Sequence, residues 1–191
     1  NNLILNSHGA VGSYSSTSYT LSCVVIAEDN GLKERDYAYS TRRNFEKTDS
    51  AKIIGELSDK KAISRLGAKP ISTQKCPVIF IPRQASGLFS QLLGALSGSR
   101  QFKKTSFLLD SVGKSVVTDS ISIYEDPLQL KTLGSRSFDL DGVLKKKQFF
   151  VQDGKVISYL MGQYSANQLG LKSTANAGGV SNGMVKSNFD G

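Results

Sequence analysis

The sequence predicts an α+β fold with antiparallel β-hairpins and two main helices, because hairpin signals occur beside two amphipathic segments. Asn30-Gly31 favours a two-residue hairpin turn, since both positions tolerate positive φ. It separates the strand-like runs Tyr19–Asp29 and Leu32–Ser40. The helical patterns are Asp49–Leu66 and Arg83–Gly98.

The first forty residues predict strands. Leu3–Asn6 predicts a short strand, and Ser7–Ser13 predicts a turn or loop. In the run Leu32–Ser40, successive side chains point to opposite faces of the strand, so Ala38 lies on the face opposite to Tyr37.

The two helical segments differ in the residues that begin, interrupt or end them. Asp49–Leu66 can be capped by Thr48 or Asp49 and is followed by a glycine that ends it. Pro77–Pro82 predicts a short buried strand between the helices. Arg83–Gly98 contains three glycines, each of which lowers helix propensity by up to ~1 kcal/mol. Such glycines are tolerated where another element packs close.

The last third predicts shorter elements. Its strands are Ser120–Tyr124, Gln148–Gln152 and Lys155–Met161, the last two joined by a turn at Asp153-Gly154. Ser165–Leu171 predicts a short helix, and Asn176–Gly183, rich in glycine and asparagine, predicts a mobile loop.

Composition supports a folded domain. The chain is 39% hydrophobic and 21% charged, which excludes global disorder. It opens without Met and both ends look abrupt. We therefore expect residues 1–191 to be the central part of a larger two-domain protein whose N-terminal and C-terminal portions are absent.

Apolar stretches are too short to span a bilayer. Cys23 and Cys76 form no CxxC motif, and we expect them to be buried, reduced thiols in a cytoplasmic protein.

The net charge of +8 could attract nucleic acid, anionic membrane or acidic peptides. Basic residues are mostly scattered, and runs such as Lys145-Lys146-Lys147 lack the interleaved aromatics of single-strand binders. We interpret them as solvated faces and hairpin edges.

Catalytic motifs are scarce. His8 is the only histidine, which excludes HExxH within this chain, and its turn context favours a loop hydrogen-bonding role. Ser-x-x-Lys occurs three times without the accompanying motifs of acyl-enzymes. The Asp-Leu-Asp-Gly sequence at 139–142 lacks the remaining ligands of an EF-hand and predicts a turn.

An ordered series of stretches nevertheless resembles one family, the PmbA/TldE branch of the TldD/PmbA family, also labelled modulator of DNA gyrase. These stretches cover most of the chain, and they are 6–9, 19–28, 34–39, 77–80, 86–89, 105–111, 137–139, 164–166, 169–174 and 177–179.

The resemblance implies a bacterial cytoplasmic assembly that processes or degrades unfolded peptides. A TldD-like subunit would carry zinc on a His-Glu-x-x-x-His helix, while the paired TldE subunit lacks these ligands. The corresponding positions here fall on Ser86, Gly87 and Gln91. A hydroxyl, a hydrogen and an amide are not zinc ligands. The resemblance therefore implies no cofactor in this chain and zinc in its partner.

We accordingly expect a non-catalytic TldE/PmbA-like subunit of a heteromeric zinc metalloprotease. Its helix Arg83–Gly98 would line a peptide chamber, to which His8, Phe138 and Asp139 could contribute as chamber or loop residues. The alternatives are a nucleic-acid-associated modulator, suggested by the charge and the gyrase label, and an independent peptidase. The peptide substrate, the partner surface and a homodimer of the isolated protein stay open.

Overall fold

The structure, a computed structural model, describes residues 1–7 and 9–188. It confirms the α+β class: helices are combined with three antiparallel sheets in the described part of the chain. The chain divides into two units. We call residues 16–78 the hairpin unit, and residues 1–15 together with those from 79 onward the sheet unit. No helix in the described part is long and apolar enough to cross a bilayer.

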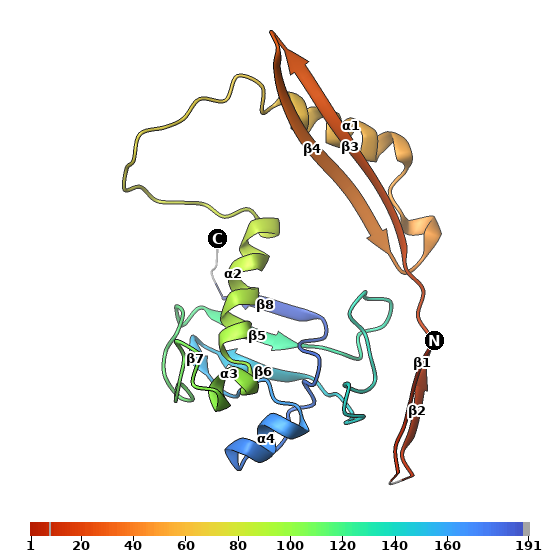
Figure 1. Cartoon of the computed structure of the whole chain (residues 1–191), viewed down its shortest axis with the longest axis vertical. Coiled ribbons are helices and arrows are strands. Elements are labelled where there is room, and N and C mark those ends of the chain that lie inside the picture. The colour runs from red at the N-terminus through yellow and green to blue at the C-terminus, as the bar shows by residue number, and fades with distance from the viewer. Residues whose placement is uncertain (8, 189–191) are drawn as a thin grey trace. The chain divides into compact units, whose positions relative to one another are not determined.

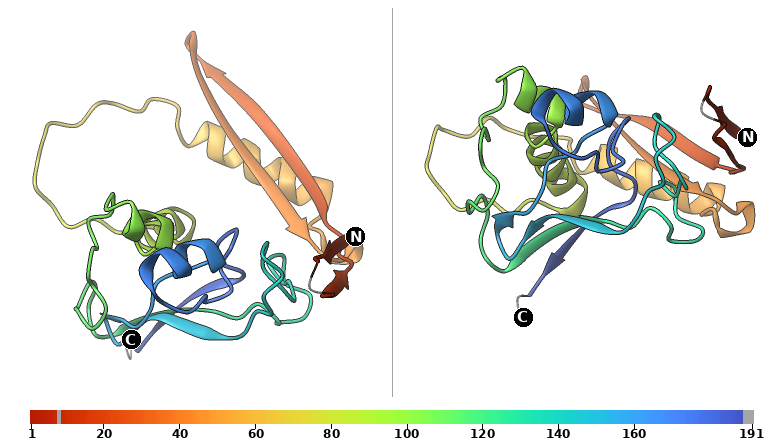
Figure 2. Two further views of the ribbon diagram at one scale, coloured as in Figure 1. Left: turned by 60° about the horizontal axis from the view of Figure 1, so that its bottom comes forward. Right: turned by 90° about the horizontal axis from the view of Figure 1, so that it is seen from below.

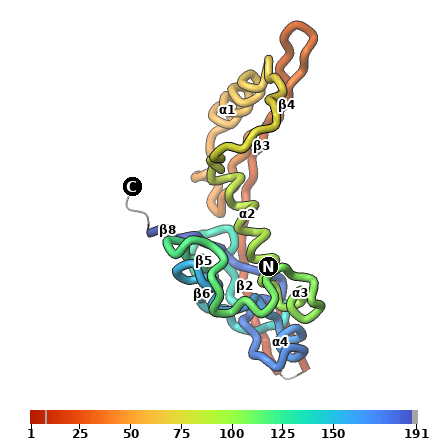
Figure 3. The backbone as a smooth tube through the Cα atoms, turned by 90° about the vertical axis from the view of Figure 1, so that its left-hand side faces the viewer, coloured from red at the N-terminus to blue at the C-terminus, as the bar shows by residue number. Residues whose placement is uncertain are grey.

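The hairpin unit is built on two long strands, β3 (Tyr19–Asp29) and β4 (Leu32–Arg42), with α1 (Ala51–Ile63) along one face (Figures 1 and 3). The turn residues Asn30 and Gly31 have φ of 49° and 78°, which confirms the predicted hairpin. A 3-10 turn, η1 (Phe45–Lys47), leads from β4 towards α1.

Small side chains bring α1 close to the hairpin. Ile54, Ser58 and Ala62 recur every fourth residue on its buried face, while Ala38 is buried on the facing side of β4. The cap is Ser50 rather than Thr48 or Asp49: its hydroxyl oxygen accepts from the Ile53 amide at 3.4 Å. Asp49 is instead held to β4, where it pairs with Arg42 at 3.4 Å.

The sheet unit contains a four-stranded antiparallel sheet in the order β7 (Lys155–Val156), β6 (Gln148–Gln152), β5 (Ile121–Glu125), β8 (Gly183–Ser187). The predicted β6–β7 turn is confirmed, with φ of 46° at Asp153 and 76° at Gly154. The predicted strand Lys155–Met161 ends after two residues, because the chain then turns into the loop leading to α4. Strand β8 was not anticipated by the sequence.

Three helices lie on one side of this sheet (Figure 2). They are α2 (Pro82–Ala95), α3 (Gly98–Phe102) and α4 (Gln163–Leu169). Gly170 ends α4 with φ of 66°, as a C-terminal glycine should. Leu96 at the end of α2 and Ala166 within α4 pack with the sheet to form the main core, together with Ile123, Phe150, Val151, Val156, Tyr159, Leu160 and Met161.

The predicted single helix Arg83–Gly98 is divided into α2 and α3. At the break, Gly98 N donates to Leu160 O at 2.8 Å and Leu160 N donates to Leu96 O at 3.0 Å. This backbone pairing uses groups that a continuous helix would need. A Cβ on Gly98 would lie 2.6 Å from the Met161 side chain, so a close neighbour does explain this glycine.

A small hairpin opens the sheet unit. Strands β1 (Asn2–Leu5) and β2 (Val11–Tyr14) pair antiparallel, so the predicted loop Ser7–Ser13 is partly strand. Tyr14 contacts Phe138 edge to face with ring centroids 5.2 Å apart. The hairpin thereby packs against the turn at residues 138–142.

Two predictions of burial were wrong. Pro77–Pro82 is exposed and forms no strand before α2 begins at Pro82, because its two prolines restrict pairing and no described strand lies alongside it. Ile79 in this run is 93% exposed. Cys76 is exposed and Cys23 is half-buried on β3, although both are free as expected.

Candidate functional site

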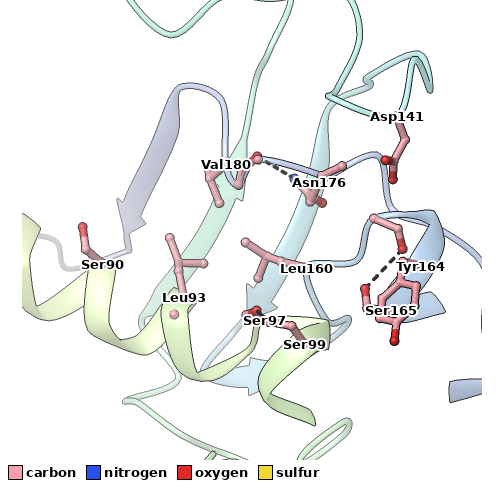
Figure 4. A pocket seen from close by; sticks show the side chains of 15 residues that line it. Ser90, Leu93, Ser97, Ser99, Asp141, Leu160, Tyr164, Ser165, Asn176 and Val180 are labelled. Carbon is pink, nitrogen blue, oxygen red and sulfur yellow. Dashed lines mark hydrogen bonds between the residues drawn. The ribbon is translucent and has the colours of Figure 1, made fainter. Parts of the chain in front are cut away.

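A cavity of about 530 Å³ lies in the sheet unit, between the end of α2, the start of α4 and the loop that precedes β8 (Figure 4). We call it the α2–α4 cavity. Its lining combines hydroxyl, amide, carboxylate and aliphatic groups. Representative residues are Ser90, Leu93, Ser97, Asp141, Tyr164 and Asn176.

One face of α2 forms a wall of this cavity. Ser90, Leu93 and Gly94 line it, and because Leu93 and Gly94 follow Ser90 by three and four residues, the three lie on the same side of the helix. Leu92 packs on the sheet core, and Leu93 contacts the core as well as the cavity. The helix therefore divides its surface between core packing and the cavity.

The opposite wall is a loop fixed by a buried ion pair. The Glu125 carboxylate and the Lys145 ammonium are 3.4 Å apart, and both side chains are fully buried. Glu125 accepts from Asn176 Nδ2 at 2.9 Å and from Ser181 N at 2.8 Å, and Lys145 donates to Gly179 O at 3.5 Å. The glycine-rich loop that the sequence predicted to be mobile is therefore packed and bound on both sides.

Burial sets the electrostatics of this ion pair. It lowers the pKa of the Lys145 ammonium, while the Glu125 carboxylate beside it acts in the opposite direction. The prediction that the lysine run at 145–147 is a solvated face is wrong for Lys145. It holds better for Lys147, which is half exposed and lies 5.1 Å above the centre of the Tyr124 ring.

The aspartate turn at 139–142 is hydrogen-bonded both to the glycine-rich loop before β8 and to the start of α4. Asp139 is 2% exposed, and its carboxylate accepts from Val143 N at 2.9 Å and from Ala177 N at 3.0 Å. Asp141 is exposed at the cavity and accepts from Gln163 N at 2.7 Å through one oxygen. The turn predicted from the sequence is confirmed, and it places one carboxylate in the interior and one at the cavity.

Ser86, Gly87 and Gln91, which the family resemblance is expected to align with the metal motif, are exposed positions of α2. The Ser86 hydroxyl donates to Arg83 O at 2.7 Å, within its own helix. A Cβ at Gly87 would meet nothing within 4 Å. Neutral hydroxyl and amide groups in this arrangement do not fit a zinc site, which takes deprotonated nitrogen, sulfur or carboxylate donors.

The other predicted site residues are dispersed. His8 lies outside the described residues. Phe138 contacts the β1–β2 hairpin, where its ring would lie 2.9 Å from a Cβ on Gly12. Asp139 orders the turn described above. Neither Phe138 nor Asp139 is among the residues that line the cavity, although both belong to the segment that positions Asp141.

Sequence reasoning missed the residues that the fold gathers at the cavity. Asp141, Tyr164 and Asn176 lie far apart in the chain and line one space. A signal was available, because two stretches that carry the family resemblance, 164–166 and 177–179, both contribute to it. Within the described residues, no three His, Cys, Asp or Glu side chains lie close enough together to hold a metal.

Comparison with known families gives two adjoining matches. Residues 1–66 match the PmbA/TldA metallopeptidase central domain, and residues 73–189 match the PmbA/TldA metallopeptidase C-terminal domain. Among curated proteins, the chain is 44% identical over 180 residues to metalloprotease PmbA of Escherichia coli. It is 42% identical over 186 residues to a PmbA homologue of Haemophilus influenzae.

These alignments cover 94% and 97% of this chain and 40% and 41% of the two relatives, so the chain spans about two fifths of their length. Among solved structures, TldE from Thermococcus kodakarensis matches with a TM-score of 0.82 and 25% identity, covering 98% of this chain and 45% of that one. A Bacteroides thetaiotaomicron protein described as a candidate modulator of DNA gyrase matches with a TM-score of 0.87 and 25% identity, covering 94% and 41%.

Proposed function

Because the chain belongs to the PmbA/TldA metallopeptidase family, we propose that it is part of a non-catalytic subunit of the PmbA/TldE type. This subunit works with a TldD-like subunit that bears His-Glu-x-x-x-His, and the pair processes or degrades unfolded peptides. Similarity to curated proteins of both the PmbA and the TldD kind is consistent with two related subunits.

The observation that carries this proposal is the chemistry of the first part of α2. Ser86, Gly87 and Gln91 occupy the positions that the family resemblance assigns to the two histidines and the glutamate. A general base must accept a proton within hydrogen-bonding reach of the attacking water. Gly87 has no side chain with which to do so.

The role left to this chain is to hold the peptide. Its α2–α4 cavity adjoins the same helix and has a rigid wall, fixed by the Glu125–Lys145 pair. Preorganised walls reduce the conformational cost of binding. The sheet unit also has a strand edge at β8, where an extended peptide could add by main-chain hydrogen bonds.

The test is reconstitution with full-length proteins. The protein containing this chain, purified alone, should leave unfolded peptides intact. Addition of a TldD-like subunit should start hydrolysis, and replacing the glutamate of that subunit's motif with glutamine should stop it. In the active pair, Ser86→Ala and Gln91→Ala should change turnover only modestly. Chelator-insensitive hydrolysis by the isolated protein, free of contaminating peptidase, would contradict the proposal.

A further inference from the structure

The α2–α4 cavity has a distinctive charge. Asp141 is its only lining carboxylate among the described residues, and no lysine or arginine lines it, although the chain contains 24 of these. One oxygen of Asp141 accepts from Gln163 N, and the other has no hydrogen-bond partner in the described structure. Asp141 also forms no ion pair with a described residue. Asp141 is therefore the only charged group among the described residues that line the cavity.

The remainder of the cavity is apolar or small. In Figure 4, Asp141 and Tyr164 lie at one side, Ser90 lies at the other along α2, and Leu93, Leu160 and Val180 lie between them. A ligand with a cationic end and an aliphatic body would match this order. Lysine and arginine have such side chains, because their methylene stems cover apolar surface while their charged ends stay polar.

One glycine of this loop leaves open space beside it. Gly179 lines the cavity with φ of 92°, a conformation that side chains other than glycine rarely adopt, and a Cβ there would meet nothing within 4 Å. Lys145 and Asn176 hold the loop through the Gly179 carbonyl. This part of the cavity wall is therefore held in place by hydrogen bonds.

We propose that the α2–α4 cavity binds a lysine or arginine side chain of an extended peptide, with Asp141 as the counter-charge. This inference rests on the proposed peptide-holding function and specifies its substrate class. The aliphatic lining favours a side chain over a terminal ammonium group, which has no methylene stem to cover Leu93, Leu160 and Val180. An acidic side chain would meet the Asp141 carboxylate and be repelled.

The experiment is calorimetric titration of the full-length protein with short peptides capped at both ends. One peptide carries a central lysine, and a second carries norleucine, which keeps the aliphatic stem without the charge. A third has a free N-terminus and no basic side chain. The lysine peptide should bind about tenfold more tightly than the norleucine peptide, as expected for one charge-assisted hydrogen bond.

Two variants give the control. Asp141→Asn should remove the preference for lysine while keeping an oxygen for Gln163 N. Asp110→Asn changes an exposed aspartate that does not line the cavity, at a φ of 48° that asparagine tolerates, and should leave the preference intact. Thermal unfolding of both variants would show that the fold is retained.

Equal binding of the lysine and norleucine peptides would overturn the assignment, as would an unchanged preference in Asp141→Asn. Tighter binding of the peptide with the free N-terminus would overturn it in favour of a terminal ammonium. None of these results affects hydrolysis by the reconstituted pair, so the proposed function would stand. Hydrolysis by the isolated protein would contradict the proposed function whatever the peptides show.

Discussion

The hairpin unit and the sheet unit bury different kinds of side chain. In the hairpin unit, a thin layer of small residues such as Ala38, Ser58 and Ala62 lies between one helix and two strands. In the sheet unit, an apolar core is joined by a fully buried ion pair between Glu125 and Lys145. The first arrangement follows from local patterns, whereas the second depends on contacts between residues distant in sequence. Substitutions should therefore have unequal effects in the two units.

The largest expected effect is in the sheet unit. Lys145→Met would leave the Glu125 carboxylate buried without its cation, and should lower the free energy of unfolding by about 3–5 kcal/mol. Lys146→Met, at the exposed neighbouring position, should change it by less than about 0.5 kcal/mol. Denaturant titration of both variants checks the contrast. Similar midpoints would show that the ion pair does not stabilise this unit.

A second contrast lies between two glycines of the sheet unit. Gly154 has φ of 76°, and a Cβ there would lie 2.7 Å from the Val117 carbonyl oxygen, whereas Gly113 has φ of 82° with open space around it. Gly113→Ala should cost about 1–2 kcal/mol from backbone strain alone. Gly154→Ala should cost roughly 1–3 kcal/mol more, because it adds a steric clash. Equal losses in thermal unfolding would show that the clash is relieved.

A smaller effect is expected in the hairpin unit. Ser50→Ala removes the cap of α1 and should cost about 0.5–1 kcal/mol. Thr48→Val should be neutral or stabilising, because the buried Thr48 hydroxyl has no hydrogen-bond partner in the described structure. Chemical denaturation distinguishes the two. A larger loss of stability from Thr48→Val than from Ser50→Ala would contradict the assignment of the cap to Ser50.

The smallest effect concerns pH. The Tyr37 amide and the Arg65 guanidinium hold the pKa of the Asp36 carboxyl below its ordinary value of 3.8. Its ionised form therefore favours folding, with a contribution that is complete above pH 3.8 and lost as the pH falls through the lowered value. Asp36→Asn should be less stable than the parent at neutral pH and equal to it in strong acid. A pH-independent difference in unfolding midpoint would contradict this.

The same division explains what the sequence could predict. Strands β3 and β4 and their Asn30-Gly31 turn follow from alternation and turn chemistry within a few residues. Strand β8 was missed because it is fixed by pairing with β5, about sixty residues earlier. The break between α2 and α3 was missed because it depends on pairing with Leu160.

The candidate site divides in a similar way. The assignment of Ser86, Gly87 and Gln91 to the metal motif stays a prediction from the family resemblance, and the structure shows only that all three lie on α2. The cavity residues Asp141 and Asn176 could not be located from the sequence, because only the folded sheet unit brings them together. The sequence around Glu125 or Lys145 does not predict which loop their buried ion pair will contact.

The central claim is that the catalytic zinc belongs to another subunit, and metal content tests it most directly. The full-length protein should be purified without a histidine tag, and its zinc should be measured by mass spectrometry before and after mild chelation. We expect well under one zinc per chain, because Ser86, Gly87 and Gln91 provide no ligand set. About one zinc per chain that resists chelation would contradict the account.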